Sequence, residues 1–126
     1  MGISMSAAKP LPKRTNSKAM LALQFWHESL VKSLESLPLD LSTRQMAILL
    51  HSYISENLHS VKTIHEELGI SKPAICRALD VLEQNKLIKR QRDKNDKRNV
   101  YIQRTVKGSV YLSEFSDIII KTMKKY

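Results

Sequence analysis

The strongest constraint on the fold is a very short link between two helix signals, Leu68-Gly69-Ile70-Ser71. Before the link, Ser60 can cap a short helix, and Gly69 can take the positive φ that commonly ends one. After the link, Ser71 is a second N-cap, and Pro73 is tolerated in the first turn of the helix that follows. A short turn that contains glycine between two helices predicts a helix-turn-helix.

A β-hairpin is expected directly after this motif. Residues 87–92 and 99–104 form two short β runs, and in the second run Val100 and Ile102 alternate with more polar neighbours. Such alternation is typical of a strand with one face in water. Residues 93–98, between the runs, are all polar or charged, so we expect a hairpin with a long charged tip.

The chain must reverse direction between the second helix and this hairpin. One residue there is expected to take the left-handed conformation, and the candidates are Asn85 and Lys86. Asparagine adopts that conformation at a lower cost than lysine, so we expect it at Asn85.

Helical signals continue on both sides of this centre. Apolar residues three or four positions apart predict a helix over residues 17–37, which Pro38 ends. Ser42 and Gln45 fit a capping box for a second helix. A last helix is expected over about residues 105–126.

The predicted order is therefore helix, helix, short helix, turn, helix, hairpin, helix, with a short edge strand at Leu58-His59. A helix-turn-helix followed by a β-hairpin is the winged-helix arrangement. We expect a mainly α fold with a small β-hairpin wing, formed as one domain by residues 17–126. Residues 1–16, with two prolines and scattered polar side chains, are expected to be a flexible basic N-terminal arm.

Charge is distributed unevenly along the chain. The net formal charge is +9, and residues 86–104 alone carry eight basic and two acidic residues, a net charge of +6. Residues 19–57 carry two basic and four acidic residues, a net charge of −2. A basic hairpin beside a capped helix is typical of a DNA interface. A solvated hairpin whose lysines serve solubility is the alternative.

Signals for catalysis, metal binding or membrane insertion are weak. Three glycines are too few and too scattered for a phosphate loop, and no nucleophile or paired-carboxylate motif stands out, so we expect neither an enzyme nor a cofactor. No apolar run is long enough to cross a membrane. No two histidines lie three or four residues apart, so no metal site is expected unless tertiary folding gathers ligands. The histidines are His27, His51, His59 and His65.

The chain has a single cysteine, Cys76, which cannot form an internal disulfide and indicates a reducing, cytoplasmic setting. If Cys76 faces DNA, its oxidation would add bulk and polarity at the interface, and nearby basic residues could make it reactive. The simpler alternative is a small, inert residue that fits the groove.

Five segments between Leu41 and Gly108 occur in a fairly specific order and spacing. They are Leu41-Ser42-Thr43-Arg44-Gln45, Ser71-Lys72-Pro73-Ala74-Ile75-Cys76-Arg77-Ala78-Leu79-Asp80-Val81-Leu82-Glu83, Leu87-Ile88-Lys89-Arg90, Asp96-Lys97-Arg98 and Thr105-Val106-Lys107-Gly108. With these segments the chain resembles the MarR family of winged-helix regulators. Lys86 stands where the family often has glycine, and the C-terminal arm is shorter than is usual in the family.

The resemblance implies a sequence-specific double-stranded DNA-binding transcription regulator that acts as a homodimer through its N- and C-terminal helices. The recognition helix would enter the major groove, and the wing would approach the minor groove. The family's wing motif matches Asp96 and Arg98, the arginine reaching DNA and the aspartate steadying it. The recognition-helix arginine matches Arg77. The DNA-binding candidates are Ser71, Lys72, Pro73, Cys76, Arg77, Arg90, Asp96, Lys97 and Arg98.

The composition of the last helix also favours a dimer. The run Ile118-Ile119-Ile120 makes it apolar on more than one side, whereas a helix that packs on a single core needs only one stripe. A terminal helix wrapped by the N-terminal helix of its own subunit is the alternative. The dimerisation candidates are Leu23, Trp26, Leu30, Phe115, Ile118, Ile119 and Met123.

Two other functions fit the same sequence. A winged helix can serve as a protein-interaction module that does not read DNA, or as a DNA-organising protein with little sequence preference. The sequence does not reveal the operator, the direction of regulation or whether a small-molecule effector exists.

Overall fold

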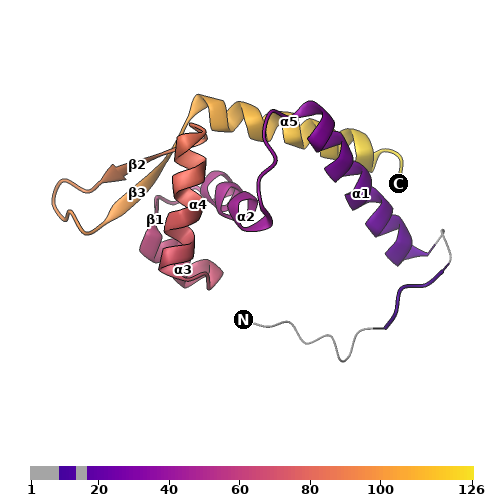
Figure 1. The fold of residues 1–126 in the computed structure, drawn as a ribbon, viewed down its shortest axis with the longest axis horizontal. Coiled ribbons are helices and arrows are strands. Elements are labelled where there is room, and N and C mark those ends of the chain that lie inside the picture. Colours follow the sequence, from indigo (N-terminus) through magenta and orange to yellow (C-terminus); the bar gives the residue numbers. More distant parts are fainter. Residues whose placement is uncertain (1–8, 14–16) are drawn as a thin grey trace.

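A computed structural model describes residues 9–13 and 17–126. Of the basic arm expected over residues 1–16, residues 1–8 and 14–16 lie outside the described residues. The described chain folds into five helices and one three-stranded antiparallel sheet (Figure 1). The elements are α1 (Lys18–Ser36), α2 (Thr43–Ile54), β1 (His59–Ser60), α3 (Val61–Leu68), α4 (Lys72–Gln84), β2 (Ile88–Arg92), β3 (Val100–Arg104) and α5 (Val106–Met123).

The helix boundaries follow the capping signals in the sequence. Ser42 and Gln45 form the predicted capping box: the Gln45 N–H donates to Ser42 Oγ at 3.1 Å, and the Ser42 N–H donates to Gln45 Oε1 at 3.0 Å. Gly69 ends α3 with a φ of 69°. Ser71 Oγ accepts the Ala74 N–H at 3.3 Å at the start of α4. Local capping therefore fixes the two helices and the turn of the motif.

The end of α4 differs from the sequence-based expectation, because the left-handed residue is Lys86 (φ 62°) and not Asn85 (φ −89°). The Leu87 N–H donates to the Leu82 carbonyl and the Lys86 N–H to the Glu83 carbonyl, both at 2.9 Å. These are the two bonds of a Schellman motif, in which the residue after the C-cap is left-handed. Leu82 and Leu87 are both fully buried, so burying Leu87 outweighs the intrinsic preference of asparagine.

The sheet order is β1-β3-β2, so the short strand expected at Leu58-His59 is present at the edge, one residue later. In it His59 pairs with Ile102. Strands β2 and β3 form the predicted hairpin, and Ile88 pairs with Arg104 at its base. The hairpin projects from the helices at the opposite end of the molecule from α1 (Figure 1).

The core lies where α2, α3 and α4 meet the base of the hairpin. Helix α5 leaves this core and packs against α1 (Figure 1). Among the residues that the structure describes, no helix is long and apolar enough to cross a membrane. The fully buried core side chains are Ile48, Leu49, Ile64, Ile75, Leu79, Leu82 and Leu87.

Candidate nucleic-acid interface

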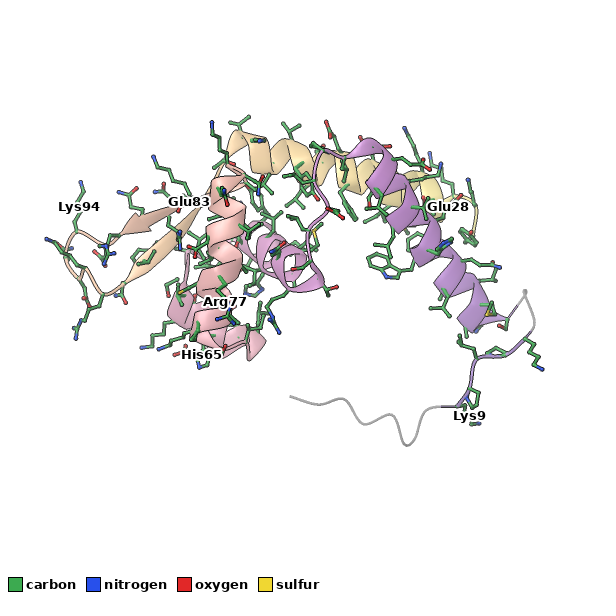
Figure 2. The ribbon with its side chains drawn as sticks, in the orientation of Figure 1. Lys9, Glu28, His65, Arg77, Glu83 and Lys94 are labelled. Carbon is green, nitrogen blue, oxygen red and sulfur yellow. The ribbon has the colours of Figure 1, made fainter. Side chains whose placement is uncertain are left out.

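Helix α4 has one buried face and one free face. Its apolar side chains lie in the core, and the opposite face exposes Lys72, Pro73, Cys76 and Arg77 to solvent. Figure 2 shows Arg77 on the outer side of this helix. The N-terminal half of α4 therefore presents two cations and one thiol on a rigid support, as a helix that reads a groove requires.

The wing and α4 share a hollow of about 680 Å³. Lys72 and Cys76 line it from α4, Asp96 and Arg98 line it from the loop of the hairpin, and Lys62 lines it from α3. The fold thus brings together candidates that the sequence places twenty or more residues apart. Arg77 and Lys97 are exposed but do not line this hollow.

Asp96 and Arg98 form the ion pair predicted for the wing. Arg98 Nε donates to Asp96 Oδ1 at 3.1 Å, and the Arg98 backbone N–H donates to the same oxygen at 3.1 Å. These hydrogen bonds lower the pKa of Asp96, the side-chain bond more than the backbone bond. The Arg98 side chain remains 91% exposed, so its other donors are available to a ligand.

The rest of the wing loop is ordered by short-range hydrogen bonds. Arg92 Nη1 donates to the Lys97 carbonyl at 2.9 Å, and the Asp93 N–H donates to the Asn99 carbonyl at 2.9 Å. The Asn95 N–H donates to Asp93 Oδ1 at 2.8 Å. Lys94, at the tip, extends into solvent (Figure 2).

Arg90, another DNA-binding candidate, is directed at α4 instead of outward. Its Nη2 lies 2.7 Å from Asp80 Oδ1, and its Nε lies 2.9 Å from Glu83 Oε1. The Arg90 backbone N–H also donates to Glu83 Oε2 at 2.9 Å. The pKa of Glu83 is lowered, first by that backbone bond and then by the guanidinium, while burial acts in the opposite direction. Arg90 braces β2 against α4, and its contact with DNA stays a prediction.

The junction that fixes the wing to α5 was not predicted from the sequence. The Tyr53 hydroxyl lies 2.9 Å from the Leu87 carbonyl oxygen and accepts the Thr105 N–H at 2.9 Å. A Cβ at Gly108 would collide with both the Tyr53 hydroxyl and the Leu87 carbonyl. A glycine inside a helix lowers its stability relative to alanine. Gly108 in the sequence is therefore a signal that another group closely approaches the helix at this position.

The dimerisation candidates fall into two groups. Leu23, Trp26, Leu30 and Met123 are exposed, whereas the other three are half-buried. Trp26, Leu30 and Phe115 line an apolar cavity of about 430 Å³ between α1, α2 and α5. The half-buried candidates are Phe115, Ile118 and Ile119, of which Phe115 and Ile118 pack against the core.

The family model described as "MarR family" matches residues 39–99, which span α2, β1, α3, α4, β2 and the wing loop. No curated protein matches the chain.

Several solved structures share the fold. A mutant of MepR from S. aureus bound to an oligodeoxyribonucleotide is 26% identical with a TM-score of 0.70, over 86% of this chain and 80% of that one. Reduced AbfR bound to DNA is 25% identical with a TM-score of 0.61, over 82% and 72%. YusO from Bacillus subtilis is 23% identical with a TM-score of 0.71, over 86% and 74%. With its five helices, its wing and its match to the family model over residues 39–99, this chain has a winged helix-turn-helix fold similar to that of MarR-family transcription regulators.

Proposed function

We propose that the chain regulates transcription in the cytoplasm as a homodimer that binds specific double-stranded DNA sequences. In this proposal the exposed face of α4 enters the major groove and the wing contacts the minor groove. The observation that carries it is the hollow shared by α4 and the wing, where Lys72 and Arg98 converge. Two relatives that are 25–26% identical, AbfR and MepR, have structures with DNA or an oligodeoxyribonucleotide bound.

The electrostatics of this side of the molecule support DNA as the partner. Carboxylates repel phosphates less when they are paired, and the carboxylates of α4 and the wing have partners. Asp96 is bonded to Arg98, Asp80 and Glu83 are bonded to Arg90, and Asp93 accepts the Asn95 N–H. The lysines of the wing are exposed and can contact the phosphates of the DNA backbone.

The exposed apolar side chains of α1 and α5 support a second copy of this chain as the partner at the other end. Trp26 is 50% exposed and Met123 is 59% exposed, although large apolar side chains are normally covered. A two-fold dimer would place two copies of α4 on an inverted repeat. The half-sites should then lie about 34–36 Å apart, which is one turn of DNA.

A titration of labelled genomic fragments at several salt concentrations tests the proposal. We expect the protein to select a few fragments at physiological salt, as a regulator does. Binding to every fragment alike with a steep salt dependence would indicate a DNA-organising protein, and no binding would indicate a protein-interaction module.

Arg77→Lys then tests how α4 reads DNA, with Arg44→Lys on α2 as the matched control. Lysine keeps the positive charge but lacks the planar guanidinium group, which can bind guanine through two hydrogen bonds. If Arg77 contacts a base, the change should cost about 1–3 kcal/mol of binding free energy and relax preference at one position. Unchanged binding to every sequence would remove Arg77 from the interface.

A further inference from the structure

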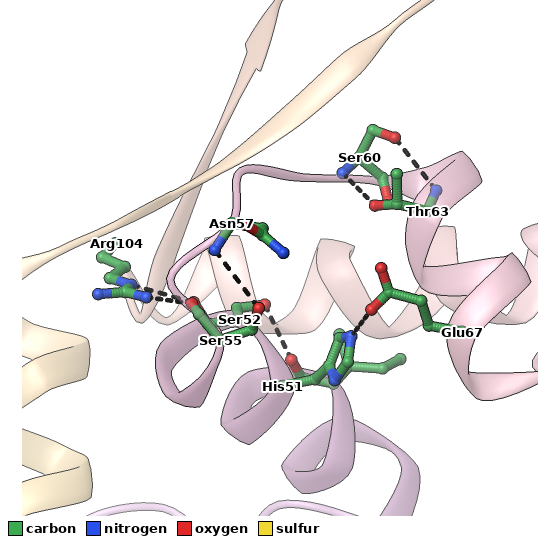
Figure 3. Close-up of polar contacts among 9 residues, drawn as sticks. His51, Ser52, Ser55, Asn57, Ser60, Thr63, Glu67 and Arg104 are labelled. Atoms are coloured by element: carbon green, nitrogen blue, oxygen red, sulfur yellow. Dashed lines mark hydrogen bonds and ion pairs between the residues drawn. The ribbon is translucent and has the colours of Figure 1, made fainter.

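Three metal-ligating side chains lie close together on three elements, one of which is the first helix of the helix-turn-helix. They are His51 of α2, His59 of β1 and Glu67 of α3, and one ligand atom from each lies within 4.8 Å of the others. His51 Nε2 and Glu67 Oε2 are 2.5 Å apart (Figure 3), and the ring centroids of His51 and His59 are 4.6 Å apart. The sequence predicts a metal site only if tertiary folding gathers the ligands, and the fold gathers these three.

The state of His59 is unusual for a buried polar side chain. It is only 2% exposed, yet neither ring nitrogen has a hydrogen-bond partner within the described part of the chain. Burying an unsatisfied polar group is costly, so native proteins keep few of them, and a bound ion is one explanation. Burial, then the neighbouring His51, lowers the pKa of His59; Glu67 acts against this shift and Arg104 adds to it. A metal ion bound to a ring nitrogen would satisfy this buried polar group.

We propose that His51, His59 and Glu67 bind a divalent transition-metal ion, with Zn²⁺ the best match. Two imidazole nitrogens and one carboxylate oxygen are ligands that Zn²⁺ accepts, whereas Mg²⁺ and Ca²⁺ prefer oxygen alone. Tetrahedral Zn²⁺ with bonds of about 2.0–2.1 Å holds its ligand atoms about 3.4 Å apart. The ion would therefore replace the direct His51–Glu67 contact and draw the His59 ring nitrogen towards the other two ligand atoms.

The site is open on one side. The side chains of His51 and Glu67 are 22% and 46% exposed, so an ion can reach them from solvent and keep one water ligand. The Arg104 guanidinium raises the local positive charge, but it is held at the Ser52 carbonyl at 3.0 Å and at the Ser55 carbonyl (Figure 3). With three protein ligands and a cation nearby, the site should bind more weakly than a closed four-ligand site.

An ion here would join α2, β1 and α3. Helix α3 leads directly into the turn before α4, and His59 pairs with Ile102 of the wing strand β3. Occupation should therefore stabilise the arrangement of the helix-turn-helix and the wing. The metal site does not depend on the DNA-binding proposal, because the ion is measured with the protein alone.

The test uses the tag-free full chain, stripped of metal and titrated with Co²⁺, followed by displacement with Zn²⁺. The expected result is one ion per chain. The absorption spectrum should be that of a Co²⁺ ion with a low coordination number, and addition of Zn²⁺ should abolish it. Glu67→Gln and His51→Gln, which change partly exposed side chains, should each weaken binding at least about tenfold because each removes a ligand. Zn²⁺ should raise the melting temperature of the unmodified protein but not of Glu67→Gln.

Two controls separate this site from other ligands of the chain. Glu66→Gln changes the neighbouring exposed carboxylate and should bind as the unmodified protein does. Cys76→Ser should bind the ion with unchanged affinity. Its Co²⁺ spectrum should match that of the unmodified protein, because no thiolate binds the ion. The proposal is overturned if the unmodified protein binds neither ion, if Glu67→Gln and His51→Gln bind as it does, or if Cys76→Ser abolishes binding.

Discussion

The base and the tip of the wing are held by different kinds of interaction. At the base, the Tyr53 hydroxyl joins the Leu87 carbonyl to the Thr105 N–H, and these residues come from distant parts of the chain. At the tip, residues 93–98 are held mainly by bonds between close neighbours, and the Arg98 side chain is 91% exposed. Water can replace a lost partner at the tip but not at the base. The base of the wing therefore contributes to stability, and the exposed tip is available for binding.

Gly108→Ala should produce the largest effect, because it breaks the base directly. The added Cβ would collide with the Tyr53 hydroxyl and the Leu87 carbonyl, so backbone or ring must shift. We expect a loss of about 2–3 kcal/mol in the free energy of unfolding, measured by urea denaturation. Ser109→Ala, at the next and exposed position of α5, should change the stability little. Equal stability of the two variants would mean that the junction at the base is loose.

Tyr53→Phe should weaken the base by removing its hydroxyl. The Thr105 N–H would lose its acceptor and the Leu87 carbonyl would lose a partner, which should cost about 1–3 kcal/mol in the free energy of unfolding. Tyr101→Phe is the matched control towards the tip, since its hydroxyl makes only a 3.4 Å contact with Asp93. If thermal melts show that both variants lose the same stability, the proposed contrast between base and tip is wrong.

Features held by local interactions could be predicted from the sequence, whereas features held by interactions between distant residues could not. Caps and turns are local, so the capping box at Ser42 and the glycine stop at Gly69 could be predicted from a few neighbouring residues. The left-handed residue at the end of α4 could not, because the burial of Leu87 decides it. The junction at Tyr53 and the cluster around His59 depend on residues that only tertiary folding brings together.

For the candidate interface, the resemblance to the family's wing motif predicted the Asp96–Arg98 pair, whose two residues lie in one loop. The sequence did not predict that Arg90 turns to Asp80 and Glu83, since that pairing crosses from β2 to α4.

Glu83→Gln should have a smaller effect, because its partner Arg90 lies between the base and the tip of the wing and the Glu83 side chain is 35% exposed. After allowance for solvent screening, the loss at pH 7 should be about 1 kcal/mol in the free energy of unfolding. Because the folded-state pKa of Glu83 is lowered, the carboxylate stabilises the protein above its ordinary pKa, and this contribution is lost as the pH falls through the lowered value.

Urea denaturation at a series of pH values checks this prediction. The difference between the unmodified protein and Glu83→Gln should therefore shrink as the pH falls into the acid range. Glu114→Gln, an exposed change on α5, should show no such difference. A gap that grows on acidification would contradict the proposed Glu83–Arg90 bracing.

The smallest effect on stability is expected at the tip, where Asp96→Ala and Arg98→Ala should leave the melting temperature unchanged. Their effect on DNA affinity should nevertheless be clear. Arg98→Ala should lower it strongly because a cation at the hollow is lost, and Asp96→Ala should lower it severalfold although the protein becomes more basic. The reason is that Asp96 orients the Arg98 guanidinium, and a mobile arginine loses more conformational freedom on binding.

Fluorescence anisotropy on a selected site measures these affinities. Glu56→Ala, an exposed change in the loop after α2, alters the net charge in the same way as Asp96→Ala and should leave affinity nearly unchanged. Tighter binding by Asp96→Ala would mean that net charge, and not an oriented arginine, governs the wing. The tip would then act as a diffuse cationic surface, and its ordered hydrogen bonds would have no part in recognition.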